Sequence, residues 1–270
     1  MRPLLGTYVV IEAVAGDDDT ALYAIDAGFS AIETVQQLMS AFDPASDVSR
    51  INECAHIETV TVHPWTAEVL ELAAAIHTDS DGLFDIGVAP RLAQWNMLPT
   101  SVMDYSESSA TKLVIDHQSV RSTAPTRIDL GGIAKGYAVD RAIEAALAAG
   151  AMSVLVNAGG DLRVAGDAEE PVYVRDPRHP QHIALAGTLR DGAIATSGIY
   201  FSKRRHDDKP VSAIVEPSSG LPLLDDLSFT VIAPSCAIAD ALTKVFALSG
   251  DPHHPAFANH HAQAVSLPTS

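Results

Sequence analysis

The sequence is poor in basic residues, aromatic residues and cysteine. Lys and Arg number 17 against 34 Asp and Glu, which gives a formal net charge of −17 at pH 7. Because a chain this acidic repels polyanions, we expect neither nucleic acid nor an anionic membrane surface as a partner. A smaller anionic ligand would need specific binding groups at its site, such as helix N-termini, single cations or a bound metal ion.

Two further absences narrow the class of protein. Cys54 and Cys236 lie far apart, in no pattern typical of a disulfide or a zinc site, so we expect two buried free thiols. No apolar run approaches the roughly 20 residues that a transmembrane helix needs. Residues 1–3 lead directly into a predicted strand at 7–13, which leaves no room for a signal peptide. We therefore expect a cytoplasmic protein, or a chain whose leader has been removed.

The apolar residues that are present suffice for a large core. They make up 47% of the chain, and the low aromatic content of 6% with many alanines predicts close packing of helices and sheets. Helical periodicity occurs at residues 19–41, 64–77, 133–149 and 236–248. Strand patterns occur at residues 7–13, 112–115, 119–121, 127–130, 154–158, 161–165, 172–175, 182–189, 193–197, 211–215 and 228–232. Because strands follow one another without intervening helices, we predict an α+β fold in one domain, residues 1–270, rather than a doubly wound sheet.

The segment at residues 251–261 is rich in His and Pro. Its two histidine pairs share their spacing with no carboxylate or cysteine, which favours a solvated loop over a metal site. We assign no chemistry to this tail.

The most informative stretch reads DLGGIAKGYAVD at residues 129–140. Gly131 and Gly132 let a ligand approach the backbone closely, and the helix predicted after them would offer free N-terminal amides to an anion. Lys135 would lie in the first helical turn, where a cation is unfavourable unless it faces a carboxylate or a phosphate. Asp129 would cap the turn or bind a ligand hydroxyl or amine. The pattern predicts a site for a phosphorylated ligand; the alternative is a glycine-rich turn with a solvated lysine.

Six more segments occur in a fixed order around this stretch. They are LLGTYVVIEA at 4–13, FDPASDVSRIN at 42–52, GLFDIGVAPRLAQW at 82–95, VNAGGDLRVAG at 156–166, IVEPSSGLP at 214–222 and ADALTK at 239–244. Together the seven segments resemble the ApbE family of FAD:protein FMN transferases. The resemblance implies a fold of intertwined α/β layers with the flavin site between them. It also implies that FAD binds with Mg²⁺ on its pyrophosphate, that FMN passes to a serine or threonine hydroxyl of a flavin-acceptor protein, and that AMP is released. Many members of the family are exported lipoproteins.

The resemblance carries flavin contacts to eight positions of this chain. These are Leu5, Phe42, Leu83, Phe84, Asp85, Asp129, Lys135 and Ile214. Leu5 stands where the family usually has Met, and Phe42 stands where it often has Tyr, so an apolar or aromatic surface is kept at both. Without the motifs, Phe42 and Phe84 would be interpreted as core residues.

The resemblance also implies a magnesium site. Its ligands would be the main-chain carbonyl of Gly132 and the side chains of Asp240 and Thr243, a hard oxygen set that suits Mg²⁺. Lys244 stands where the family more often has threonine, and an ammonium group cannot ligate a cation. Lys244 would therefore act as a catalytic cation on the phosphates or occupy the place of the metal. The alternative is that Asp240 pairs locally and Lys244 is solvated.

The segment at residues 213–217 departs from the family. The family commonly reads HIIDP there, with the histidine as proton acceptor, whereas this chain has Ala213 at the first position. Alanine accepts no proton, so either Ser212, His206 or Glu216 acts as the base or the transfer is slow. His206 is more typical of a solvated loop.

We therefore expect a magnesium-assisted transferase that acts on FAD and a protein hydroxyl. Three alternatives remain open at this point. The first is a flavin-binding protein that has lost transfer, which Ala213 favours. The second is an FAD pyrophosphatase that releases FMN and AMP, and the third is a structural or interaction protein.

Overall fold

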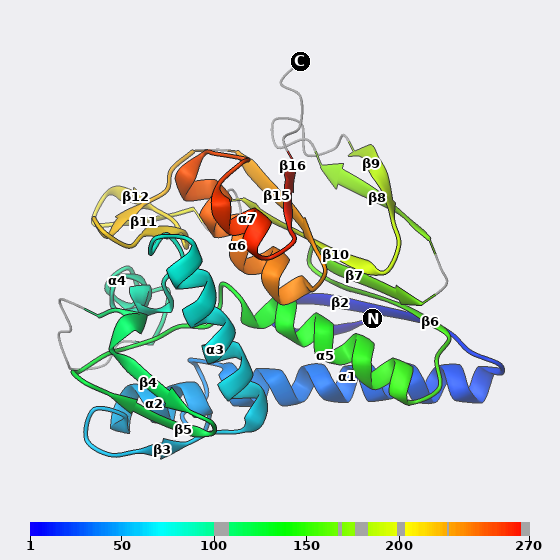
Figure 1. Ribbon diagram of the computed structural model, residues 1–270, viewed down its shortest axis with the longest axis horizontal. Coiled ribbons are helices and arrows are strands. Elements are labelled where there is room, and N and C mark those ends of the chain that lie inside the picture. The colour runs from blue at the N-terminus through cyan, green and yellow to red at the C-terminus, as the bar shows by residue number, and fades with distance from the viewer. Residues whose placement is uncertain (100–107, 167–168, 176–182, 199–202, 226, 266–270) are drawn as a thin grey trace.

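A seven-stranded antiparallel sheet forms the centre of the protein. The computed structural model describes residues 1–99, 108–166, 169–175, 183–198, 203–225 and 227–265. The order of strands is β1 (Arg2–Leu4), β2 (Thr7–Val14), β6 (Ser153–Ala158), β7 (Asp161–Gly166), β10 (Gly192–Gly198), β15 (Ser228–Ala233) and β16 (Gln263–Val265). The helices α1 (Asp18–Met39), α5 (Ala134–Ala148) and α6 (Cys236–Ser249) lie side by side in front of these strands in Figure 1.

A smaller group of elements lies beside this layer, at the lower left of Figure 1. It consists of α2 (Asp47–Cys54), α3 (Pro64–Asp79) and the sheet of β3 (Val60–Thr61), β5 (Ser119–Ser122) and β4 (Leu113–Asp116). The remaining elements are short helices and hairpins between or beside these two groups. They are η1 (Ile86–Val88), α4 (Ala89–Gln94), η2 (Ala110–Lys112), α7 (Pro255–Asn259) and the hairpins β8 (Glu170–Arg175) with β9 (Ile183–Leu189), β11 (Arg204–His206) with β12 (Lys209–Val211), and β13 (Val215–Glu216) with β14 (Leu221–Pro222). None of the helices in the described ranges is long and apolar enough to cross a membrane.

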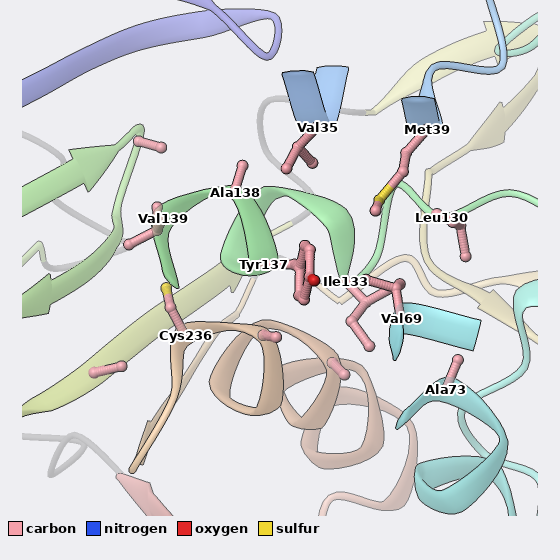
Figure 2. Packing of buried hydrophobic residues seen from close by; sticks show 14 of the residues in the cluster. Val35, Met39, Val69, Ala73, Leu130, Ile133, Tyr137, Ala138, Val139 and Cys236 are labelled. Carbon is pink, nitrogen blue, oxygen red and sulfur yellow. The ribbon is translucent and has the colours of Figure 1, made fainter. Parts of the chain in front are cut away.

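Helix α5 is the centre of the core. It packs against α1, α6, β6 and β7, and small residues on its buried face let these neighbours approach closely. Figure 2 shows Val35 and Met39 of α1, Val69 and Ala73 of α3, and Cys236 of α6 around Ile133, Tyr137 and Ala138. The α1 face, the α6 face and the sheet face therefore share one apolar core around this helix.

Helix α6 packs against α5, and hydrogen bonds join the two helices. A Cβ on Gly136 would clash with the main-chain carbonyl of Cys236, so only glycine permits this approach. The buried Asp140 carboxylate accepts the N–H groups of Cys236 at 2.8 Å and Ala237 at 2.9 Å, which have no partner within their own helix. Arg163 Nη1 donates to Asp140 at 2.7 Å and balances its charge.

The sequence predicts the α+β class and most long elements correctly. The helices expected at 64–77, 133–149 and 236–248 form within a few residues of those bounds. Residues 127–130 are not a strand, because their main chain is bound by a side chain instead of a neighbouring strand. The strand expected at 211–215 is interrupted, since Ser212 bonds the loop internally. Residue 182 lies outside the described residues.

The prediction of a solvated loop at residues 251–261 is also wrong. Helix α7 lies there, with Ala256 and Phe257 buried against α6 and α3, and His260 lies 2.9 Å from Asp79. Helix α2 and strands β1, β3 and β16 were also missed, because each is too short to show a clear period. Both cysteines are free thiols; Cys236 is buried, as expected, and Cys54 is partly exposed.

We predict that Gly136→Ala lowers the free energy of unfolding by about 1–3 kcal/mol, or more if α5 and α6 cannot separate, because the added methyl group overpacks their contact. Urea unfolding followed by circular dichroism measures this loss. Gly16→Ala is the matched control, since a Cβ on Gly16 meets nothing within 4 Å. Equal unfolding midpoints for the two variants would contradict the contact.

Candidate functional site

The turn that begins at Asp129 is held from three sides. The main-chain N–H of Asp129 donates to the carbonyl of Ile86 at 2.8 Å. Asn52 of α2 makes two hydrogen bonds to the main chain of Ile128. Its Nδ2 donates to the Ile128 carbonyl at 3.0 Å, and its Oδ1 accepts the Ile128 N–H at 2.7 Å. The N–H of Gly131 donates to Asp129 Oδ2 at 3.1 Å. Burial raises the pKa of Asp129, and the bond from Gly131 opposes that rise.

Two hollows open at this turn, and Asp129 lines both of them. The larger has a volume of about 420 Å³, and its lining includes Leu5, Gln36, Phe42, Gly131 and Lys135. The smaller has a volume of about 60 Å³, and its lining includes Leu83, Phe84, Asp85, Gly132, Ala213, Ile214 and Lys244. The structure therefore brings all eight positions of the implied flavin contacts to the two hollows around one turn.

A third hollow, of about 470 Å³, shares Asp85, Val88 and Val215 with the small one. Its lining is mostly polar. It includes Arg91, Gln94, Ser108, Ser218 and Ser219. The small hollow therefore shares lining residues with both large ones.

The two phenylalanines at the hollows differ in burial. Phe42 is 68% exposed, so its ring is available to a ligand and its interpretation as a core residue is wrong. Phe84 is 5% exposed and packs in the core, and it also lines the small hollow. Leu5 has a positive φ of 55°, and its N–H donates to Gln36 Oε1 at 2.7 Å. This bond holds Leu5 at the rim of the large hollow.

Behind the turn lie two ammonium groups and two carboxylates. Lys135 Nζ of α5 contacts Asp161 Oδ2 of β7, and lies 3.3 Å from Asp240 Oδ2 of α6. Lys244 Nζ, one helical turn further along α6, contacts Asp240 Oδ1 and donates to the Asp240 carbonyl at 2.9 Å. Asp240 is fully buried between the two lysines. We call these four residues the charge cluster.

The charge cluster shifts the pKa values of its members in different directions. Burial acts to raise the pKa of Asp240, but Lys135 and Lys244 outweigh it and hold that pKa below its usual range. Burial and the neighbouring Asp240 carboxylate raise the pKa of Asp161, against the effect of Lys135. Burial acts to lower the pKa of Lys135, yet the two carboxylates outweigh it and raise that pKa. Lys135 is therefore protonated and Asp240 ionised at neutral pH.

The residues that the resemblance implies as magnesium ligands do not fit Mg²⁺ as they are arranged. Both Asp240 oxygens contact ammonium groups, and its carbonyl accepts from Lys244 and from Thr243 Oγ1, the latter at 2.6 Å. Thr243 Oγ1 also lies 2.6 Å from Ser197 Oγ. The Lys244 ammonium occupies one carboxylate oxygen and the main-chain carbonyl of Asp240, and Lys135 occupies the other carboxylate oxygen.

Position 213 carries no proton acceptor. Ala213 is exposed at the small hollow. Ser212 beside it is fully buried, and its hydroxyl donates to the carbonyls of Leu223 at 2.6 Å and Ile214 at 3.1 Å. These bonds favour a structural role for Ser212 over that of a base.

The two other candidate bases are also poorly suited. Glu216 accepts bonds from Ser218 Oγ at 2.6 Å and the N–H of Ser219 at 2.9 Å, which lower the pKa of Glu216 and weaken it as a base. His206 lies on β11, 3.4 Å from Asp207. It lines a different hollow, of about 380 Å³, from the one that Ala213 lines.

Sequence reasoning missed two residues that hold the site. Asp161 pairs with Lys135 although 26 residues separate them, and Asn52 binds Ile128 across 76 residues. Both lie in segments that carry the family resemblance, 156–166 and 42–52. The one local signal for Asp161 is an acidic residue at the start of a strand, directly after the glycine pair at 159–160.

The sequence model of the ApbE family matches residues 5–267. The chain belongs to the ApbE family. This membership confirms the resemblance inferred from the seven segments.

Relatives of the ApbE family cover most of the chain. The FAD:protein FMN transferase of Vibrio cholerae is 28% identical over 241 residues, which are 82% of this chain and 71% of the relative. The protein of the same name from Chlamydia trachomatis is 29% identical over 233 residues, 77% of this chain and 70% of the relative. The crystal structure of the ApbE protein from Thermotoga maritima has a TM-score of 0.81 at 29% identity, and the match covers 97% of this chain and 91% of that one. The fold of this chain is therefore the ApbE fold.

We predict that Lys135→Met lowers the free energy of unfolding at pH 8 by about 3 kcal/mol, because two buried carboxylates lose a partner. This value lies at the low end of the range for breaking a buried ion pair, because the Lys135 side chain is 35% exposed to solvent. Without Lys135 the pKa of Asp161 in the folded state rises further above its unfolded value of about 3.9. The part of the penalty that comes from Asp161 is therefore full above that folded pKa and disappears as the pH falls toward 4. Urea unfolding at pH 8 and pH 5 measures it, with Lys209→Met on exposed strand β12 as the control.

Proposed function

We propose that this chain is an FAD:protein FMN transferase. It binds FAD, cleaves the pyrophosphate, transfers FMN to a serine or threonine hydroxyl of a flavin-acceptor protein and releases AMP. The observation that supports this most directly is the convergence of the eight flavin positions on two hollows that share Asp129. The named relatives, FAD:protein FMN transferases of two bacteria, support the same activity.

The two hollows suit one elongated ligand. The large one offers the exposed ring of Phe42 and the apolar side chain of Leu5 to a flavin ring. The junction at Asp129 is where a pyrophosphate would lie between Lys135, at the large hollow, and Lys244, at the small one. Both ammonium groups can then neutralise phosphate charge, which is the main requirement for phosphoryl transfer.

The reaction needs one nucleophile and one leaving group. The hydroxyl oxygen of the acceptor attacks the phosphorus of the FMN half, and the bond from that phosphorus to the bridging oxygen breaks as AMP leaves. The hydroxyl proton must pass to a base or to solvent. Ala213 contributes nothing to this step, and the nearby Glu216 has a lowered pKa. We therefore expect transfer to be slow in the unmodified chain.

A second candidate function is flavin binding without transfer. Ala213 favours it, because the small hollow keeps the Lys244 ammonium and its flavin positions but lacks an imidazole at position 213. Hydrolysis of FAD to FMN and AMP is the third. The reaction products distinguish these three functions.

The decisive test incubates the purified chain with FAD and Mg²⁺, with and without a flavin-acceptor domain. We expect AMP in solution and a fluorescent flavin that stays on the acceptor after denaturation. Free FMN with AMP would indicate a pyrophosphatase, and bound intact FAD would indicate a binding protein. Asp129→Ala should weaken FAD binding by about tenfold, which corresponds to about 1.4 kcal/mol for one lost charge-assisted hydrogen bond. Unchanged affinity would remove Asp129 from the site.

We predict that Ala213→His raises the rate of FMN transfer by about 10²-fold or more, because it adds a general base with a pKa near 6.5 beside the small hollow. The gain in rate should increase with the fraction of neutral imidazole, and therefore rise from pH 5.5 to pH 7.5. Initial rates across this range measure it. Ala213→Phe is the control, since it adds a ring of similar size that cannot accept a proton. A gain in both variants, or in neither, would show that proton transfer does not limit this chain.

A further inference from the structure

We propose that Lys244 is the built-in cation of this site, so that the chain binds the pyrophosphate of FAD without a divalent metal ion. The inference rests on the proposed function for the identity of the ligand. It concerns one ammonium group and the oxygens it contacts. It departs from the magnesium site that the family resemblance implies.

The contacts of Lys244 carry the inference. Its Nζ contacts Asp240 Oδ1 and donates to the Asp240 carbonyl at 2.9 Å, so the ammonium lies among the oxygens that a cation at this position would use. Lys135 contacts the other oxygen of the same carboxylate. Asp240 therefore meets two fixed positive charges while it is fully buried.

The surroundings of Lys244 exclude a solvated surface lysine. Its side chain is only 18% exposed. Its Cε lies 3.5 Å from where a Cβ of Gly132 would be, which places the ammonium directly behind the turn at residues 129–132. It also lines the small hollow together with Asp129. An ammonium has three N–H donors, and two of them account for the bonds to Asp240. The third can donate to a phosphate oxygen in the hollow.

A metal ion would have to displace this lysine. Mg²⁺ binds oxygen ligands at about 2.0–2.1 Å and prefers a nearly ideal octahedron. Both Asp240 carboxylate oxygens are in contact with ammonium groups, and Thr243 Oγ1 is hydrogen-bonded to the Asp240 carbonyl and lies 2.6 Å from Ser197 Oγ. The positive charge of Lys244 would also repel the ion from the same place. A lysine and Mg²⁺ therefore compete for one position, and the lysine is covalently part of the chain.

The test measures FAD affinity by the quenching of flavin fluorescence, in Mg²⁺ and in EDTA. For the unmodified chain we expect dissociation constants that agree within about twofold. For Lys244→Thr we expect binding in EDTA to weaken by about tenfold or more and Mg²⁺ to restore it, because a neutral oxygen ligand replaces the fixed charge. Lys244→Arg keeps the charge and should bind FAD equally in both buffers. Lys209→Thr is the control for loss of an exposed lysine.

A second measurement needs no FAD. Mn²⁺ binding followed by electron paramagnetic resonance should be absent in the unmodified chain and present in Lys244→Thr. This result stands even if the substituted chain binds FAD poorly for other reasons. It also keeps the inference testable on the unmodified protein alone.

The outcomes separate this inference from the proposed function. Strong dependence of FAD binding on Mg²⁺ in the unmodified chain, or Mn²⁺ bound to it, would overturn the inference and leave the transferase intact. FAD that binds in EDTA but is never transferred would overturn the transferase and support the inference. Failure to bind FAD in either buffer would overturn both.

Discussion

The contact of α5 with α6 at Gly136 is the constraint on which the site depends. Because Gly136 has no side chain, the two helices meet main chain to main chain. Each helix then binds amides at the start of the other: Asp140 of α5 accepts from Cys236 and Ala237, and Asp240 of α6 accepts the N–H of Gly136 at 3.2 Å. Two buried carboxylates are thereby fixed by main-chain donors as well as by cations. Their positions follow from helix geometry rather than from flexible side chains.

The charge cluster is a consequence of this contact. Asp240 lies one helical turn after the start of α6 and therefore beside Lys135, and Lys244 lies one turn further and therefore beside Gly132. The same spacing that packs the helices also places two ammonium groups at the junction of two hollows.

Much of the fold and of the site could be predicted from the sequence, because long periodic segments and ordered motifs carry that information. What could not be predicted depends on partners far apart in the chain. Residues 127–130 look like a strand, yet Asn52 binds their main chain. For Lys244 the spacing on α6 allowed several roles, and only the structure shows its ammonium on Asp240. Phe84 is a core residue and Phe42 is not, because the burial of a side chain depends on which other elements pack against it.

The long separation of the cluster's members has a consequence for folding. Lys135 and Asp240 are 105 residues apart, and Asp240 reaches its partners only when α6, near the end of the chain, has docked on α5. A chain in which α6 has not docked lacks both the second lysine and the small hollow. A ligand held by this cluster therefore binds the complete native state and stabilises it by mass action. Ligand occupancy and correct folding are in this way thermodynamically linked, and the docking of α6 completes both.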